Sequence, residues 1–163
     1  MTSTISSSGG SVIKPSSTSA KSFYVTSSPF EQKIQYYRGV RHGQHIFISG
    51  TTAVDSTSSP SAPQIKFPGD AAQQMRVALE ECLQAVRALG GRGHESVVRV
   101  RMFVGKQEAC GPVGEAYREF FGWGQGGSGN PEVGTAATMI VVPGGFVDDR
   151  MLVEVEVDAM IES

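Results

Sequence analysis

The feature that most constrains the fold is an apolar stripe at helical spacing in the middle of the chain. Its members lie one, three or four residues apart, and they are Ala72, Met75, Leu79, Cys82, Leu83, Val86 and Leu89. Residues three and four apart share one face of an α-helix, so the stripe predicts an amphipathic helix of about 20 residues. Asp70 is placed to start this helix, and Gly90-Gly91 is placed to end it.

The segments around this helix alternate between apolar and polar residues or form short apolar runs, as β-strands do. The predicted strands are residues 33–41, 45–49, 98–104, 139–142 and 153–161. A second helical spacing covers residues 108–121. The resulting order, β-β-α-β-α-β-β, predicts an α+β fold in which a single mixed sheet carries two long helices on one face.

The beginning of the chain has a different composition. Ser and Thr fill 15 of the first 28 positions, and few apolar residues stand between them. Such a segment buries too little apolar surface to offset the entropy of ordering it. We therefore expect a polar N-terminal arm over residues 1–30 and a folded domain over residues 31–163.

Charge and hydropathy exclude several classes of partner. The 14 Lys and Arg against 16 Asp and Glu give a net charge of −2, whereas a general nucleic-acid-binding protein needs a basic surface. No run approaches the ~18 apolar residues of a membrane span. We expect neither a nucleic-acid nor a membrane partner, but a small-molecule one.

The cysteines and histidines suggest no disulfide or metal site. Cys82 and Cys110 form no disulfide framework, which suits a reducing compartment. His42 and His45 lie three apart but have no Cys, Asp or Glu nearby in sequence to complete a zinc site. We expect a cytoplasmic protein without a metal. A mitochondrial presequence is the alternative, because residues 1–30 contain no acidic residue.

One face of the predicted sheet is charged. Arg99 and Arg101 share it with Glu154, Glu156 and Asp158. If these side chains are solvated, they need no partners. If other copies of the chain cover the face, the acidic and basic groups must pair, because an unpaired buried charge is very costly.

Several segments, in this order, resemble the Rid/YjgF family of small trimeric proteins, which includes enamine/imine deaminases. They are Gly39–Gly50, Leu79–Leu83, Leu89–Gly91, Val97–Val104, Ala116–Phe121 and Leu152–Ala159. The resemblance covers residues 34–161 and includes the Ile48-Ser49-Gly50 end of a hairpin strand.

The resemblance implies a homotrimer of chorismate-mutase-like subunits, with ligand clefts between subunits and no cofactor. By position the catalytic residue is Glu154, which would orient the hydrolytic water. A carboxyl in an apolar cleft has a raised pKa, and this suits proton transfer. The implied substrate-binding residues are Tyr36, Ser49, Gly50, Thr51, Tyr117, Ala137, Thr138 and Met139.

The chain departs from the family at one position. The deaminases bind the substrate carboxylate through an Arg at the start of the penultimate strand. This chain has no Arg between Arg118 and Arg150, and Ala137 takes that place. A methyl group cannot replace bidentate binding. The chain thus resembles an Arg-less branch, for which we expect a larger, less acidic substrate. Arg38, which shares a strand face with Tyr36, is a replacement anion anchor, although a solvated Arg on an edge strand is the favoured alternative.

The leading hypothesis is a small-molecule enzyme that acts on a reactive enamine, imine or enol-type intermediate. It would catalyse hydrolytic deamination, or proton-transfer isomerisation or cyclisation, in metabolite damage control or in biosynthesis. The alternative is a non-catalytic ligand-binding or structural trimer, which should tolerate Glu154→Gln. An endoribonuclease or translation inhibitor follows only from older descriptions of the family, and the near-neutral charge argues against it.

Overall fold

The computed structural model describes residues 4–7 and 9–162 of the chain. Its strands are β1 (Thr4–Ser7), β2 (Gly10–Ile13), β3 (Lys21–Thr26), β4 (Gly39–His42), β5 (His45–Thr51), β6 (Val97–Val104), β7 (Ala136–Val141) and β8 (Val153–Met160). Its α-helices are α1 (Pro29–Ile34), α2 (Ala71–Ala88) and α3 (Cys110–Phe121). Short 3-10 turns cover Gly93–Ser96, Gln107–Ala109 and Pro131–Val133.

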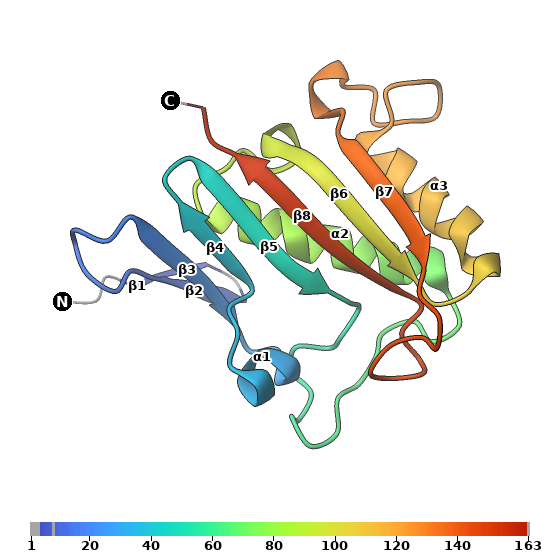
Figure 1. Ribbon diagram of the computed structural model, residues 1–163, viewed down its shortest axis with the longest axis horizontal. Coiled ribbons are helices and arrows are strands. Elements are labelled where there is room, and N and C mark those ends of the chain that lie inside the picture. Colours follow the sequence, from blue (N-terminus) through green and yellow to red (C-terminus); the bar gives the residue numbers. More distant parts are fainter. Residues whose placement is uncertain (1–3, 8, 163) are drawn as a thin grey trace.

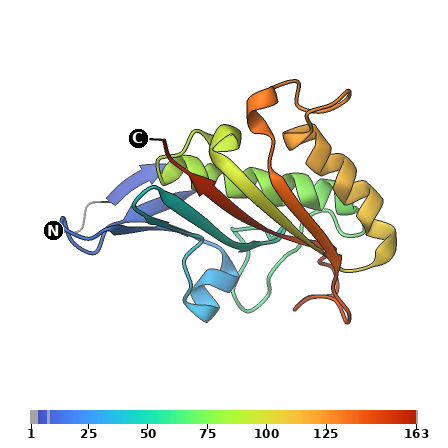
Figure 2. The same cartoon turned by 45° about the horizontal axis from the view of Figure 1, so that its top comes forward.

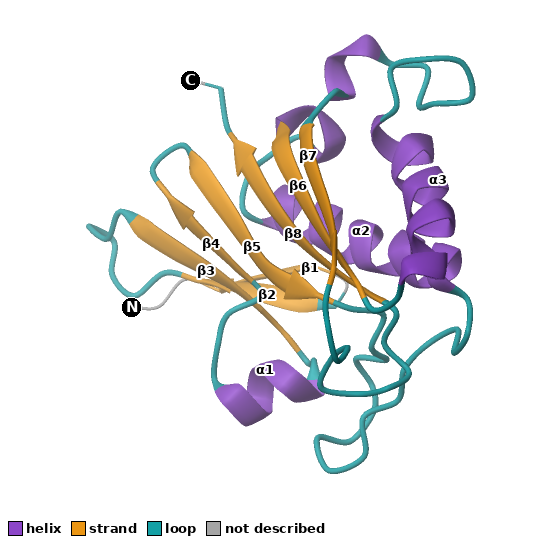
Figure 3. Cartoon of the chain, turned by 45° about the vertical axis from the view of Figure 1, so that its right-hand side comes forward, coloured by secondary structure: helices purple, strands orange, loops and turns teal. Residues whose placement is uncertain are grey.

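The described strands form one sheet in the order β1-β2-β3-β4-β5-β8-β6-β7. β6 and β7 are parallel, and the other neighbouring pairs are antiparallel. Figures 1 and 3 show α2 and α3 together on one face of this sheet. The predicted α+β fold, with a single mixed sheet and two long helices on one face, is confirmed.

The core lies between the sheet and α2. As predicted, Asp70 caps this helix by accepting the N–H of Gln73 at 3.0 Å. The apolar stripe packs inward against β5 and β8, the strands that α2 contacts. Its fully buried members are Met75, Leu79, Cys82, Leu83 and Val86.

The strand predicted over residues 33–41 is wrong in its first half. Pro29–Ile34 is helical, Gln35 ends that helix with a φ of 67°, and β4 begins only at Gly39. Pro29 occupies the first turn, where its fixed φ favours a helix. Tyr36 therefore lies in an irregular connection and not on a strand.

The segment predicted as a polar arm extends the sheet. β3 pairs with β4, and β2 pairs with β3, so the boundary expected at residue 30 falls inside the sheet. Tyr24 on β3 belongs to the core, and Gly10 of β2 lies against its ring so closely that a side chain there would overlap it. Pairing with an existing strand satisfies the backbone of a Ser/Thr-rich segment without an apolar face of its own.

The sheet face opposite α2 and α3 is open in the single chain. Its charged residues pair with one another: Arg101 with Asp158 at 3.0 Å and with Glu156 at 3.5 Å, and Arg99 with Asp158 at 3.8 Å. Phe47 and Ile140 on the same face are half exposed. None of the described helices combines the length and apolar character needed to cross a membrane.

Candidate active site

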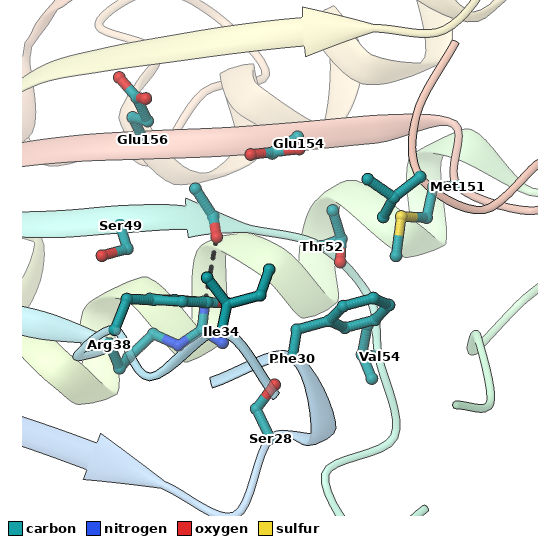
Figure 4. Close-up of a pocket in the computed structure, with 13 residues that line it drawn as sticks. Ser28, Phe30, Ile34, Arg38, Ser49, Thr52, Val54, Met151, Glu154 and Glu156 are labelled. Atoms are coloured by element: carbon teal, nitrogen blue, oxygen red, sulfur yellow. Dashed lines mark hydrogen bonds between the residues drawn. The ribbon is translucent and has the colours of Figure 1, made fainter. Parts of the chain in front are cut away.

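A cleft of about 430 Å³ opens where α1, the end of β5 and the start of β8 meet. Figure 4 shows Phe30, Ile34 and Arg38 on one side of it and Met151 and Glu154 on the other. The cleft combines an apolar wall with a few polar side chains, as small-molecule sites commonly do. The polar side chains are Ser28, Tyr36, Arg38, Ser49, Thr52, Glu154 and Glu156.

Glu154 is the acidic residue of this cleft that is suited to proton transfer. It is partly buried on β8, where its register partner on β6 is Phe103. Burial raises the pKa of its carboxyl, the negative charge of Glu156 raises it further, and Arg38 opposes both. A carboxyl with a raised pKa can accept and return a proton closer to neutral pH than an exposed one.

Gly50, at the end of β5, makes room for this carboxylate. A Cβ at position 50 would overlap Oε1 of Glu154. Gly50 does not have a positive φ, so close approach and not backbone conformation requires glycine here. The neighbouring Ser49 lines the cleft, and its hydroxyl donates to the carbonyl of Tyr37 at 2.7 Å.

Arg38 forms a buried ion pair beneath the cleft. Its Nε donates to Oε1 of Glu31 at 2.7 Å, and both side chains are almost fully buried. Its Nη1 donates to Oγ1 of Thr51 at 2.6 Å and to the carbonyl of Gly50 at 3.3 Å, the bond drawn in Figure 4. The expected solvated Arg on an edge strand is therefore wrong, because α1 brings Glu31 against this side chain.

The ion pair is anchored on β3. Glu31 also accepts the backbone N–H of Thr26 at 2.9 Å and its hydroxyl at 2.7 Å. Each oxygen of the carboxylate is thus bonded, as a buried charge requires. The ring centroid of Tyr36 lies 6.0 Å from Cζ of Arg38. Burial raises the pKa of Tyr36, although the charge of Arg38 opposes this.

A second, smaller cavity of about 70 Å³ lies behind the cleft. We call it the inner cavity; it is lined by Gly9, Tyr24, Thr26, Ser28, Arg38, Val54, Ser56, Glu81 and Gln84. Burial raises the pKa of Glu81 to about 7. The adjacent Cys82 is fully buried, and its pKa rises to about 12, which agrees with the predicted inert thiol.

The structure brings together six of the ten predicted site residues, at the cleft or directly behind it, and leaves four elsewhere. Tyr36, Arg38, Ser49, Gly50 and Glu154 line the cleft, and Thr51 lies buried behind it, bonded to Arg38. β8 and β6 separate the cleft's β5 from β7, the strand that carries the next predicted residues. Those residues of β7 are Ala137, Thr138 and Met139.

Tyr117 lies in a different hollow, at the C-terminal end of α3. Its hydroxyl hydrogen-bonds Oγ1 of Thr135 at 2.8 Å, and its ring packs against Phe121. The Gly-rich segment that follows α3, residues 122–129, begins at this hollow and extends away from the sheet, as the orange loop in Figure 2 shows. Within one chain, neither feature lines the cleft.

Sequence reasoning missed the contribution of α1. Its residues Phe30 and Ile34 line the cleft, Glu31 holds Arg38, and Ser28 precedes the helix. A usable signal was present, because Ser followed by Pro and then an acidic residue is typical of a helix start. Among the described residues, no group of three or more His, Cys, Asp or Glu is arranged to hold a metal ion.

Comparison with known proteins agrees with this architecture. Residues 26–161 match the sequence pattern of the family described as Endoribonuclease L-PSP. The chain is 32% identical over 132 residues to the uncharacterized protein SCO2049 of Streptomyces coelicolor, an alignment that covers 81% of this chain and 86% of the relative.

Solved structures show the same fold. Rv2704 of Mycobacterium tuberculosis, a member of the YjgF/YER057c/UK114 family, superposes with a TM-score of 0.67 at 26% identity. The match covers 86% of this chain and 99% of Rv2704. The YjgF gene product of E. coli superposes with a TM-score of 0.61 at 24% identity, over 78% of this chain and 88% of that protein.

Proposed function

Because the chain belongs to the Rid/YjgF/L-PSP family, we propose that it is a small-molecule enzyme acting on a reactive enamine, imine or enol-type intermediate. The reaction takes place in the cleft beside Glu154. The observation that carries this proposal is the partly buried Glu154 carboxylate, which faces the cleft and has a raised pKa. Gly50 has no side chain, and a Cβ there would overlap this carboxylate.

In the hydrolytic reaction, Glu154 accepts a proton from a water molecule as the water oxygen bonds to the imine carbon. The proton then passes to the nitrogen, which gives a carbinolamine. The same carboxylate next carries the hydroxyl proton to the nitrogen as the C–N bond breaks, so ammonia leaves and a carbonyl group remains. In an isomerisation or cyclisation, the same carboxylate takes a proton from one substrate atom and returns it to another. Both reactions need one proton-transfer group and no cofactor.

We propose further that the active assembly is a homotrimer in which other copies cover the open sheet face. The exposed Phe47 and Ile140 support this, because large apolar side chains on one face favour burial against a partner. The ion pairs of Arg99 and Arg101 are already formed, so covering them leaves no charge unpaired. In this assembly a neighbour's β7 would complete the cleft with Thr138 and Met139.

The test is hydrolysis of imines generated in situ by an amino-acid oxidase or dehydratase, with semicarbazide trapping of the imine that survives. 2-Iminopropionate and bulkier imines are compared. We expect faster imine loss with the protein, and a loss of about 100-fold or more with Glu154→Gln. Glu108→Gln, on an exposed residue away from the cleft, serves as the matched control. No acceleration with any imine would contradict the deaminase.

The competing function is ligand binding without catalysis. A binding trimer keeps its ligand affinity in Glu154→Gln, whereas an enzyme loses turnover. The distinction therefore rests on measuring both binding and turnover with the same variant.

A further inference from the structure

In the described part of the chain, two hydrogen-bond donors in the wall between the cleft and the inner cavity make no short hydrogen bond. Ser28, Arg38 and Val54 line both spaces and so form this wall. Arg has five N–H donors, and Nε and Nη1 of Arg38 are committed to Glu31, Thr51 and Gly50. Nη2 makes no short hydrogen bond to a described residue, although a weaker side-chain hydrogen bond between this guanidinium and Tyr36 acts to lower the pKa of Tyr36.

The hydroxyl of Ser28 is in the same situation. It makes no hydrogen bond to a described residue, and Ser28 is itself 5% exposed. In the described part of the chain, no fully buried polar side-chain atom lacks a partner. Nη2 of Arg38 and Oγ of Ser28 are therefore both in contact with solvent, although the residues that carry them are buried.

We propose that Ser28 and Arg38 form a subsite for an anionic group of the cleft's ligand, a carboxylate or a group of similar charge, and that Glu81 couples its binding to uptake of a proton. Calling this ligand the substrate rests on the proposed function; the subsite itself does not. An ionised acceptor suits a guanidinium and a hydroxyl, because charge-assisted hydrogen bonds are the strong ones.

Glu81 controls the net charge behind the subsite. Glu31 already neutralises Arg38, so the cluster of Glu31, Arg38 and a protonated Glu81 is neutral. Ionisation of Glu81 gives the same cluster a charge of −1 and repels an incoming anion. An anion consequently binds more tightly below a pH of about 7 than above it, and its binding draws a proton onto Glu81.

The other charged and titratable groups around Glu81 come from each neighbouring element. They are Arg38, Glu31 on α1, Lys66 in the loop before α2, Tyr24 on β3 and Cys82 on α2. Burial raises the pKa of Cys82 to about 12, so this thiol does not titrate near neutral pH. An anion in the cleft also acts on the carboxyl of Glu154. The experiment must therefore distinguish proton uptake by Glu154 from proton uptake by Glu81.

The experiment is titration calorimetry of the purified protein with pyruvate at pH 6 and pH 8, in two buffers of different ionisation enthalpy. Pyruvamide is the neutral comparator. We expect pyruvate to bind roughly tenfold more weakly at pH 8, as one added charge nearby implies, and to take up a proton near pH 7. Pyruvamide should show neither effect.

Variants of Ser28, Glu81 and Glu154 separate the contributions of these residues and leave the buried Glu31–Arg38 ion pair intact. Ser28→Ala should weaken the binding of pyruvate about three- to tenfold, whereas Ser27→Ala, at the exposed neighbouring residue, should not change it. Glu81→Gln should abolish the proton uptake near pH 7 and flatten the pH dependence there, whereas Glu154→Gln should retain the uptake and the pH dependence that belong to Glu81. The exposed Glu80→Gln is the control on α2.

Several outcomes would overturn the proposal. Absence of pyruvate binding, or equal affinity for pyruvate in Ser28→Ala and Ser27→Ala, removes the subsite. Proton uptake that persists in Glu81→Gln removes the coupling. These are equilibrium measurements, so a protein that hydrolyses no imine can still support the subsite, and one that hydrolyses imines can still lack it.

Discussion

The carboxylate of Glu154 lies directly against the Cα of Gly50, in space that any other residue at position 50 would fill. Glu154 lies on β8, and Gly50, which leaves space for its carboxylate, lies on the neighbouring strand β5. The position of the proton-transfer group is thus set by two neighbouring strands, at a register shift between Ile48 and Thr51 that includes Gly50.

Gly50→Ala should displace the Glu154 carboxylate and lower imine hydrolysis by about 100-fold, the size expected for a misplacement of about 1 Å. The atom that must move is the end of a flexible side chain, so the free energy of unfolding should change by less than about 1 kcal/mol. Steady-state kinetics and urea denaturation measure the two effects.

Gly111→Ala is the matched control, because a Cβ there meets no atom within 4 Å. In α3 this change should leave activity intact and stabilise slightly. Wild-type activity in Gly50→Ala would show that the position of Glu154 is not critical.

Glu31→Gln should lower the free energy of unfolding by about 3 kcal/mol, because it leaves the buried Arg38 without its counter-charge. Glu119→Gln breaks the exposed pair with Arg76, which has a similar N–O distance of 2.6 Å, and should cost no more than about 1 kcal/mol. Urea denaturation of both variants makes the comparison. An equal loss of unfolding free energy in the two variants would mean that burial does not make the Glu31–Arg38 pair contribute more to stability than the exposed pair.

Glu81 should make the protein less stable as the pH rises. Its pKa is about 7 in the folded chain and near 4.3 when unfolded, so the native state holds the proton more tightly. The stabilisation is complete below the unfolded pKa and is lost as the pH rises through about 7. The free energy of unfolding should be about 1–3 kcal/mol lower at pH 8 than at pH 5 from this group alone.

Urea denaturation at both pH values tests this. The difference in the free energy of unfolding between pH 5 and pH 8 should shrink by this contribution of Glu81 in Glu81→Gln, but not in the exposed Glu80→Gln. An unchanged pH dependence in Glu81→Gln would mean that its carboxyl is solvated.

Phe47→Asp should prevent assembly through the open sheet face, because it places a new charge beside Asp158, the register partner of Phe47. Light scattering after gel filtration should give three times the 17.3 kDa chain mass for the wild type and a single chain mass for the variant. Phe67→Asp changes an equally exposed aromatic residue in the loop before α2 and should remain assembled. A wild type of 17.3 kDa would contradict the trimer.

The sequence predicted best what depends on regular periodicity. The stripe of α2, its Asp70 cap and the alternation of β8 are all present, and together they place Glu154 on the sheet face away from the helices. Gly50 and Ser49 could be assigned to the same cleft through the family resemblance. Each of these depends on local pattern and strand order.

What the sequence did not predict depends on a tertiary contact. Arg38 and Glu31 are seven residues apart, and no periodicity links them, because a helix end at Gln35 reverses the chain between them. The environment of Glu81 likewise requires β3 and Gly9 to line the same cavity as α2. A composition rich in Ser and Thr gave no sign that this segment would pair with the sheet.

The inner cavity is closed in part by Gly9 and Tyr24, which lie ahead of residue 26, where the match to the family begins. A segment outside the matched region thus contributes to how much water reaches the partly buried carboxyl of Glu81. Two proteins with identical residues over the whole matched region could then carry different charges behind the same cleft at one pH. Functional divergence here would need no change in any residue that touches the ligand.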